Sequence, residues 1–380
     1  YFIPVMTAVM LLYYFKKGKQ LIWGKEDVVI LIFIGYAVAS SLVATEGRYD
    51  DLRNIYIIYL LPYCLYLIAK NIDIDSNVFK MLAFASLFHL VQAVLLSVYE
   101  FQSGTTLYQP DPKVDWVDVG SMRRISGSLG TPIVLGVFLQ VLFGFIYLAY
   151  RYGLVSKLVF RSSIPFLILL NLLTFTRSVW LGAIVMFIYL MYKTSEDVGA
   201  KLMRVAGFVA LSVVIVGVVV AVSPDVQKRI SGEENANFRI VMAQASLNMI
   251  ADSPIVGWGM GTFDDFSDRY LFDARGVYIV KDTSHVTVLT ILAELGILGT
   301  IPFLLFMYFN IRPKGIRFKE LPAEDRLIVA VIVGTLISFG VNAFLIDMRF
   351  YSLAYSWLFV SLGFICNIYH ENRQLKEQQV

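Results

Sequence analysis

Long hydrophobic runs separated by short polar segments recur along the whole sequence. A helix that crosses the hydrocarbon layer of a membrane needs roughly 20 mostly apolar residues. Eleven runs approach or reach this length, and we expect them to be membrane-spanning helices: 1–15, 27–44, 54–69, 78–99, 131–150, 162–176, 178–192, 205–222, 285–309, 327–346 and 351–369. The sixth and seventh runs are together too long for one crossing, so we expect a hairpin that turns at Thr176-Arg177-Ser178. The pattern predicts an all-α polytopic membrane protein.

The composition agrees with a membrane protein and excludes other classes. Of the 380 residues, 58% are hydrophobic and only 16% are charged, whereas soluble domains carry roughly 25% charged residues. A soluble globule and a disordered chain are both excluded by these figures. The net charge of +3 is too small to indicate a nucleic-acid partner. Cys64 and Cys366 lie in apolar runs, so neither a disulfide framework nor a Cys-based metal site is expected.

The basic residues divide unequally between the two sides of the membrane. If the eleven runs alternate in direction, 19 of the 32 Lys and Arg residues fall in short loops on one side, which the positive-inside rule assigns to the cytoplasm. These loops include Lys25, Lys70, Arg312 and Arg373. The first run then starts outside and the carboxyl end lies inside. Because the sequence opens at Tyr1 within an apolar run, we expect a truncated amino end and about twelve spans in the full chain.

Two loops on the outer side are too large to be simple turns, since loops beyond about 15 residues are usually functional or disordered. They cover 100–130 and 223–284. We therefore expect one integral membrane domain made of an amino-terminal bundle (1–222), an extracytoplasmic loop (223–284) and carboxyl-terminal helices (285–380). Within the second loop, residues 237–251 predict an amphipathic helix on the membrane surface, capped by Asn235 or Asn237. Its apolar positions are Phe238, Val241, Met242, Ala245 and Met249.

The candidate chemistry gathers at the outer side. The predicted topology places there these ionisable residues: Arg123, Arg124, Arg177, Arg239, His285, Asp347 and Arg349. Two or three guanidinium groups at the lipid–water boundary suit a diphosphate, and a histidine can take a proton from a hydroxyl near neutral pH. Together they suit the attack of a hydroxyl on a sugar whose leaving group is a lipid diphosphate. For each residue the structural alternative is a helix cap, an interfacial anchor or, for Asp347 and Arg349, a mutual ion pair.

Metal chemistry is not indicated by this pattern. The acidic groupings on the outer side are Asp264-Asp265 and the set Asp111, Asp115 and Asp118, and neither has a typical metal-ligand spacing. We therefore predict no cofactor and no metal, with arginine balancing the charge of the leaving group.

The ninth run combines a histidine with two glycines. On a continuous helix at about 100° per residue, Gly296 lies within roughly 20° of His285 and Gly299 within about 40°. Such a stripe predicts a groove where another helix or a lipid tail can approach closely. Glu294 falls on the opposite face, and we interpret it as a buried structural partner of another span, with catalysis as the alternative.

The order of these motifs resembles the O-antigen ligase/polymerase superfamily of bacterial membrane glycosyltransferases. The resemblance rests on an Arg after a Thr-rich span (Thr174–Trp180), on Pro-x-x-Gly-x-Gly at 254–259 after Arg239, and on His-x10-Gly-x-x-Gly-Thr from His285 to Thr300. Arg124 resembles a basic residue that precedes a span start in relatives. The residue that follows His285 is Val286, where the family usually has a polar side chain.

The resemblance implies a metal-independent, inverting transfer of a glycan on the outer side of the bacterial inner membrane. The implied donor is an undecaprenyl-diphosphate-linked glycan, and the acceptor is lipid A-core for a ligase or a carrier-linked glycan for a polymerase. Ligase-like transfer is our first hypothesis, with His285 as the base, and Arg177, Arg239 and Arg124 as the diphosphate ligands. A polymerase, a secondary transporter or lipid flippase, and a non-catalytic envelope scaffold are the alternatives.

Overall fold

A computed structural model describes most of the chain. The described residues are 21–43, 48–72, 76–103, 122–194, 234–271, 286–312 and 315–378, with isolated positions at 7, 16, 105, 118–119, 199, 203, 206–207, 210, 213–214 and 217. The chain divides into two compact units. Unit 1 comprises Tyr1–Asp73, Glu233–Leu321 and Ala343–Val380, and unit 2 comprises Ile74–Gly232 and Pro322–Asn342. Each unit is described by itself.

Seven helices in the described part of the chain are long and apolar enough to cross a membrane. They cover Lys25–Val43, Asp50–Asn71, Lys80–Ser103, Pro132–Arg151, Thr287–Ile311, Ala323–Ala343 and Ser352–Gln378. All seven match predicted spans, which confirms an all-α polytopic membrane protein. The expected first and eighth spans, 1–15 and 205–222, fall largely outside the described residues, so the total of eleven stays a prediction.

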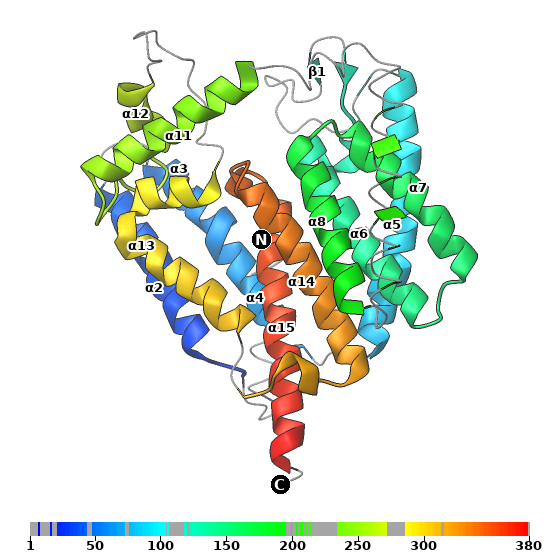
Figure 1. Cartoon of the computed structure of the whole chain (residues 1–380). Coiled ribbons are helices and arrows are strands. Elements are labelled where there is room, and N and C mark those ends of the chain that lie inside the picture. The colour runs from blue at the N-terminus through cyan, green and yellow to red at the C-terminus, as the bar shows by residue number, and fades with distance from the viewer. Residues whose placement is uncertain are drawn as a thin grey trace. The chain divides into compact units, whose positions relative to one another are not determined.

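Unit 1 is built around α13 (Thr287–Ile311) and α15 (Ser352–Gln378) (Figure 1). Helix α2 (Lys25–Val43) packs along α13, and α4 (Leu61–Asn71) packs along α15. A short helix, α3 (Arg48–Ile55), and a π-helical turn, η1 (Tyr56–Leu60), continue directly into α4. Buried aromatic rings fill the space between these helices, so the unit has a solid apolar core. They are Phe33, Tyr59, Tyr66, Phe303, Phe306, Tyr355 and Phe359.

Unit 2 contains the remaining spans. Helix α6 (Pro132–Arg151) packs against α5 (Ser76–Ser103), α7 (Lys157–Leu173) and α8 (Arg177–Thr194). The side chain of Gln140 on α6 donates to the carbonyl of Val179 at 2.8 Å and accepts from the hydroxyl of Ser338 on α14 (Ala323–Ala343). Helices α7 and α8 are separate and are joined by the turn at 174–176, as the predicted hairpin requires, but neither is among the seven helices named above, so their two crossings stay a prediction. A two-residue β pairing joins Asp118–Val119 to Met122–Arg123.

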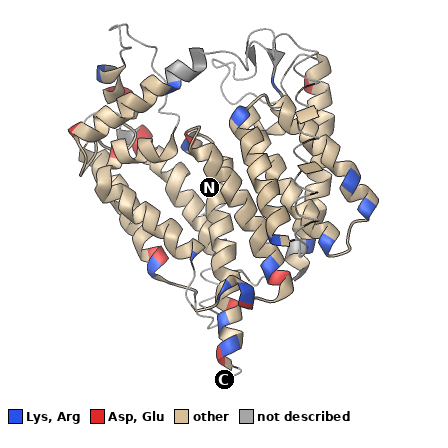
Figure 2. Cartoon of the chain, in the orientation of Figure 1, with Lys and Arg blue, Asp and Glu red and all other residues tan. Residues whose placement is uncertain are grey.

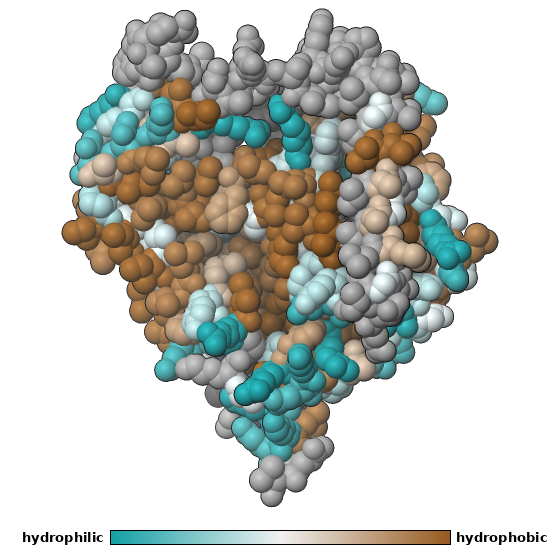
Figure 3. Space-filling model, in the orientation of Figure 1, coloured by the Kyte–Doolittle hydropathy of each residue, from teal (hydrophilic) through white to brown (hydrophobic). Residues whose placement is uncertain are grey.

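The surface chemistry follows the requirement of a lipid environment. Figure 2 shows charged residues gathered near the ends of helices such as α15. Figure 3 shows a broad hydrophobic surface over the middle of the visible helices. On α13 the exposed apolar side chains are Ile297, Leu298, Ile301, Leu304, Leu305 and Ile311. Apolar residues facing outward are expected when lipid, rather than water, is the surrounding solvent.

The predicted amphipathic helix of the second outer loop exists as α11 (Glu234–Asp252), but two of its expected features are wrong. The helix starts at Glu234, so Asn235 and Asn237 lie within it and are not at the N-cap position. Three residues of its apolar stripe are buried against protein, because Met242, Ala245 and Met249 pack with Ala293 of α13. This face of the helix therefore contacts α13 rather than the membrane surface.

Candidate active site at the head of helix α13

The first turn of α13 is fixed to the turn that precedes α15. The hydroxyl of Thr287 donates to the carbonyl of Ile346 at 3.2 Å and accepts from the backbone N–H of Met348 at 3.0 Å. His285 itself lies outside the described residues, so its predicted role is untested. The chain that follows it is held in place by these two bonds.

Helix α13 is interrupted at Gly296, which has φ 57° and ψ −165°. The continuous-helix geometry used to place Gly296 and Gly299 on the same face as His285 is therefore wrong, because the axis changes at the break and the helix starts after His285. A non-helical residue leaves neighbouring backbone groups without their usual partners, and in a membrane such groups must be satisfied by other parts of the protein.

The loop 254–259 supplies these partners. Two of its backbone N–H groups donate to α13, from Trp258 to Ala293 at 3.1 Å and from Gly259 to Glu294 at 2.8 Å. Two bonds run the other way, from Ile297 to Pro254 at 2.9 Å and from Leu298 to Ile255 at 3.1 Å. The Pro-x-x-Gly-x-Gly segment is therefore interlocked with the break in α13, which joins two motifs that the sequence analysis identified separately.

Glycine is required on both sides of this contact. A Cβ atom on Gly257 would lie 2.3 Å from the carbonyl oxygen of Glu294, and one on Gly296 would lie 2.3 Å from that of Ile255. Both residues also have positive φ values, +73° and +57°, which L side chains rarely adopt. Gly299 instead faces Tyr36 of α2, where a Cβ would come within 3.1 Å of the ring. The glycines thus serve close packing, with a loop at one site and a helix at the other.

A buried ion cluster lies beside the break. The guanidinium of Arg349 reaches Glu294 with one nitrogen at 2.7 Å and Asp347 with another at 2.8 Å. All three side chains are at most 4% exposed. Burial alone lowers the pKa of Arg349, but the carboxylates of Asp347 and Glu294 outweigh it and raise this pKa well above its ordinary value. Glu294 is buried as expected, but its partner Arg349 lies in the turn before α15 and not in another span. The pairing of Asp347 with Arg349 is confirmed.

A pocket opens next to this cluster, and we call it the outer pocket. It is lined by polar groups and two phenyl rings: Asn54, Asp264, Thr290, Glu294, Arg349, Phe263 and Phe350. Behind Gly261, which also lines it, the carboxylate of Asp51 is buried, and one of its oxygens has no hydrogen-bond partner among the described residues. Among the described residues, no group of three or more His, Cys, Asp or Glu is arranged to hold a metal ion.

In unit 2, the structure brings Arg124 to the turn that carries Arg177. The guanidinium of Arg124 donates to the carbonyl of Thr174 at 2.9 Å and to the hydroxyl of Thr176 at 2.6 Å. Between them, Phe175 has φ 47°, a strained conformation for a non-glycine residue. Arg177 then starts α8 with an exposed side chain. Two cationic side chains and a helix amino terminus, each favourable to an anion, therefore meet at one turn.

Arg239 occupies an exposed position on α11, away from the stripe that packs on α13. It belongs to unit 1, whereas Arg124 and Arg177 belong to unit 2. The structure therefore supports the grouping of Arg124 with Arg177 and leaves their grouping with Arg239 and His285 as a prediction.

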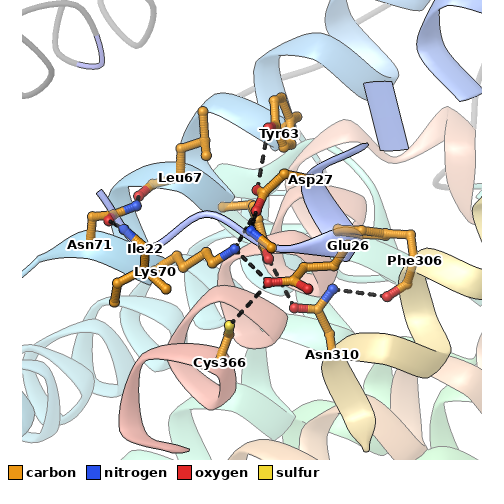
Figure 4. A network of polar contacts seen from close by, with 12 residues as sticks. Ile22, Glu26, Asp27, Tyr63, Leu67, Lys70, Asn71, Phe306, Asn310 and Cys366 are labelled. Carbon is orange, nitrogen blue, oxygen red and sulfur yellow. Dashed lines mark hydrogen bonds and ion pairs between the residues drawn. The ribbon is translucent and has the colours of Figure 1, made fainter. Parts of the chain in front are cut away.

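Sequence reasoning missed a second buried charge cluster in unit 1, shown in Figure 4. Lys70, expected in a cytoplasmic loop, is fully buried in α4 and contacts Glu26 at 2.7 Å and Asp27 at 2.5 Å on α2. The Cys366 thiol of α15 also faces Glu26, at 3.8 Å. This cluster lies outside the set of ionisable residues that the sequence analysis identified at the outer side. A Lys and its carboxylates 43 or 44 residues apart leave no local sequence signal.

A comparison with protein-family models gives a match to part of the chain. Residues 162–304 match the model of the O-antigen ligase family, which confirms the predicted resemblance. The matched range runs from α7 to the middle of α13 and includes Arg177, Arg239, the 254–259 loop and His285. No curated protein matches the sequence.

Proposed function

We propose, from the match of residues 162–304 to the model of the O-antigen ligase family, that the chain transfers a glycan from an undecaprenyl-diphosphate carrier to an acceptor hydroxyl. The reaction takes place at the outer face of the bacterial inner membrane. Lipid A-core is the proposed acceptor, and a second carrier-linked glycan is the alternative acceptor, which would make the protein a polymerase.

The interlock between loop 254–259 and the break at Gly296 is the observation that carries this proposal. Four backbone hydrogen bonds hold the loop on α13, and Gly257 and Gly296 leave room for no side chain at the contact. The loop lies between Arg239 and His285 in the sequence, so fixing it restricts the path of the chain between these two residues. This arrangement supports a preorganised site, as transfer chemistry requires.

The proposed step forms one bond and breaks one. The acceptor oxygen attacks the anomeric carbon of the donor glycan from the face opposite the diphosphate, and the bond between that carbon and the phosphate oxygen breaks. The electron pair leaves with undecaprenyl diphosphate, whose charge is balanced by Arg177, Arg124 and Arg239. His285 takes the proton of the acceptor hydroxyl. One displacement inverts the anomeric configuration, and no metal takes part in the step.

The ion cluster acts in this proposal as a positioning device. Arg349 holds Glu294 at 2.7 Å, and Met348 next to it holds Thr287. Both contacts fix the first two turns of α13, directly after His285. The outer pocket offers amide, hydroxyl and carboxylate groups beside two phenyl rings, a combination that suits the hydroxyls and apolar faces of a sugar. We therefore assign the acceptor glycan to this pocket.

Single alanine substitutions of His285, Arg177 and Arg239 test the proposed roles. Each should abolish glycan transfer in cells while the amount of protein in the membrane stays normal. Arg326→Ala is the matched control, because Arg326 is an exposed cation at the start of α14, and it should retain transfer. Normal glycan transfer by all three site variants would contradict the proposal.

Gel analysis of surface polysaccharide from a deletion strain distinguishes the two acceptors. Long carrier-linked chains that never reach the lipid core identify a ligase. Core that bears a single repeat unit identifies a polymerase. A normal ladder would contradict both assignments.

A secondary transporter is the second candidate, and the structure contains features that favour it. Transporters bind substrate at interrupted helices with buried charge, and α13 has both a break at Gly296 and a buried Glu294. However, the backbone groups around the break bond to loop 254–259, whereas a transporter leaves such groups available to its substrate. A counterflow assay in liposomes separates the two: solute exchange without formation of a glycosidic bond would favour transport.

A further inference from the structure

A second pocket in unit 1 lies at the end of α13 opposite to the outer pocket. Four basic side chains line it: Lys25 at the start of α2, Arg312 after the end of α13, and His370 and Arg373 near the end of α15. The outer pocket is lined by Thr290 and Glu294 of α13 and the second pocket by Phe309 and Arg312, so the two pockets lie toward opposite ends of this membrane-spanning helix. We call this second site the basic pocket.

One acidic side chain, Glu26, also lines the basic pocket. The buried Lys70 ammonium contacts it at 2.7 Å (Figure 4) and is shared with Asp27. Asp27 also accepts from the backbone N–H of Gly24 at 2.7 Å and from the hydroxyl of Tyr63 at 3.3 Å. One ammonium and two carboxylates leave this cluster one negative charge when both carboxylates are ionised, and the three cations Lys25, Arg312 and Arg373 on the walls outweigh it.

Arg312 and Arg373 on the walls have only weak partners within the protein. Arg373 meets Glu377 at 3.6 Å, but both side chains are about half exposed or more, and exposed pairs of this kind contribute little. Arg312 donates to the hydroxyl of Tyr308 at 3.2 Å, which balances no charge. An anion would therefore gain several cationic contacts on entering the pocket.

The surroundings of the pocket match the boundary between lipid headgroups and acyl chains. Trp23, Phe309 and Tyr369 also line it, and aromatic rings are enriched at this depth. Along α13 and α2, the apolar side chains of Ile311, Tyr308 and Val28 are about half exposed and offer a surface for acyl chains. The distribution of basic loops assigns this end to the cytoplasmic leaflet, where basic pockets between helices bind lipid headgroups.

We propose that the basic pocket binds the phosphate headgroup of an anionic phospholipid of the cytoplasmic leaflet. The bound lipid bridges α2, α13 and α15 at the end opposite to the site of glycan transfer. This site is independent of the proposed catalytic residues, so it can be tested whether or not the chain is a transferase.

Native mass spectrometry of the purified full chain in detergent tests the proposal, with phosphatidylglycerol as the probe and phosphatidylcholine as the zwitterionic comparison. We expect retention of phosphatidylglycerol over phosphatidylcholine, and roughly 30-fold weaker binding after the double substitution Arg312→Gln and Arg373→Gln. Lys376→Gln is the matched control, because Lys376 lies one turn further along α15 and pairs with Glu320 at 2.9 Å. It should bind like the original protein.

A second measurement covers the case in which the double variant fails to fold. Cys366 lines the pocket and is partly accessible, so in a Cys64→Ser background its reaction with a maleimide reports on occupancy. Phosphatidylglycerol should slow this reaction, whereas phosphatidylcholine and inorganic phosphate should not. Equal protection by phosphatidylcholine, or protection by inorganic phosphate alone, would overturn the proposal, as would undiminished lipid binding by a folded double variant.

Discussion

Replacing Arg349 by alanine tests the buried ion cluster most severely. The substitution leaves the carboxylates of Glu294 and Asp347 without the cation that both contact within 2.8 Å, in a site where neither side chain is more than 4% exposed. Breaking a buried pair by removing one partner costs about 3–5 kcal/mol of stability, because the remaining charge is buried without compensation. For a protein of 380 residues, that corresponds to a decrease in Tm of roughly 4–6 °C.

Thermal unfolding of purified protein in a single detergent measures this effect. Arg326→Ala, which removes an exposed cation, should change the free energy of unfolding by less than about 0.5 kcal/mol. Adding Glu294→Gln to Arg349→Ala removes one unpaired charge and should restore part of the loss, because contacting residues are coupled by about 0.5–3 kcal/mol. If Arg349→Ala unfolds at the same temperature as Arg326→Ala, the buried cluster does not exist as described.

Three further predictions concern the surroundings of α13. Gly296→Ala should release loop 254–259 and increase its cleavage by a protease, because the new Cβ would lie 2.3 Å from a carbonyl oxygen, whereas Gly35→Ala on α2 meets nothing within 4 Å and should behave as the original protein does. Asp51→Asn should maintain or raise Tm, since it removes a buried carboxylate charge that has an unpartnered oxygen. The hydrogen bond to Asp252 raises the pKa of the Tyr270 hydroxyl, so this contact stabilises the loop below the ordinary tyrosine pKa of about 10 and is lost as the pH rises through the raised value. Cleavage near residue 270 should therefore increase at high pH in the original protein but not in Tyr270→Phe.

The spans were predictable because a helix that crosses the lipid hydrocarbon layer needs roughly 20 mostly apolar residues in a row. Helices α13, α14 and α15 start and end within a few residues of their expected bounds, except that α15 continues past its apolar run to Gln378. The α7–α8 hairpin was predictable from length, since one crossing cannot accommodate 159–192. Apolar residues in a sequence do not distinguish burial in lipid from burial against protein. For this reason α11 was expected on the membrane surface, whereas its apolar residues pack against α13.

The details of the site depend on contacts between distant residues, which leave no periodic signal. Arg349 was expected to pair with Asp347, two residues away, and it does, but its second partner is 55 residues away in the sequence. The break at Gly296 was not predicted because it lies within a continuous apolar run, and the backbone groups beside it bond to loop 254–259, which is distant in the sequence. Glycine at this position was correctly identified as a point of close approach.

Lys70 and Arg312 show that the role of a basic residue depends on its partners in the fold as well as on its place in the sequence. Lys70 and Arg312 were both expected in cytoplasmic loops. Lys70 is fully buried between two carboxylates, whereas Arg312 lines an accessible pocket. Lys70 therefore contributes to the packing of α2 against α4, whereas Arg312 faces a pocket.

The most direct test of glycan transfer uses the purified protein in proteoliposomes with an undecaprenyl-diphosphate-linked glycan and a lipid A-core acceptor. We predict that glycosylated acceptor and undecaprenyl diphosphate appear in a one-to-one ratio, and that His285→Ala protein inserted to the same level forms neither. Transfer by the His285→Ala protein at the original rate, or exchange of solute without any new glycosidic bond, would contradict the account.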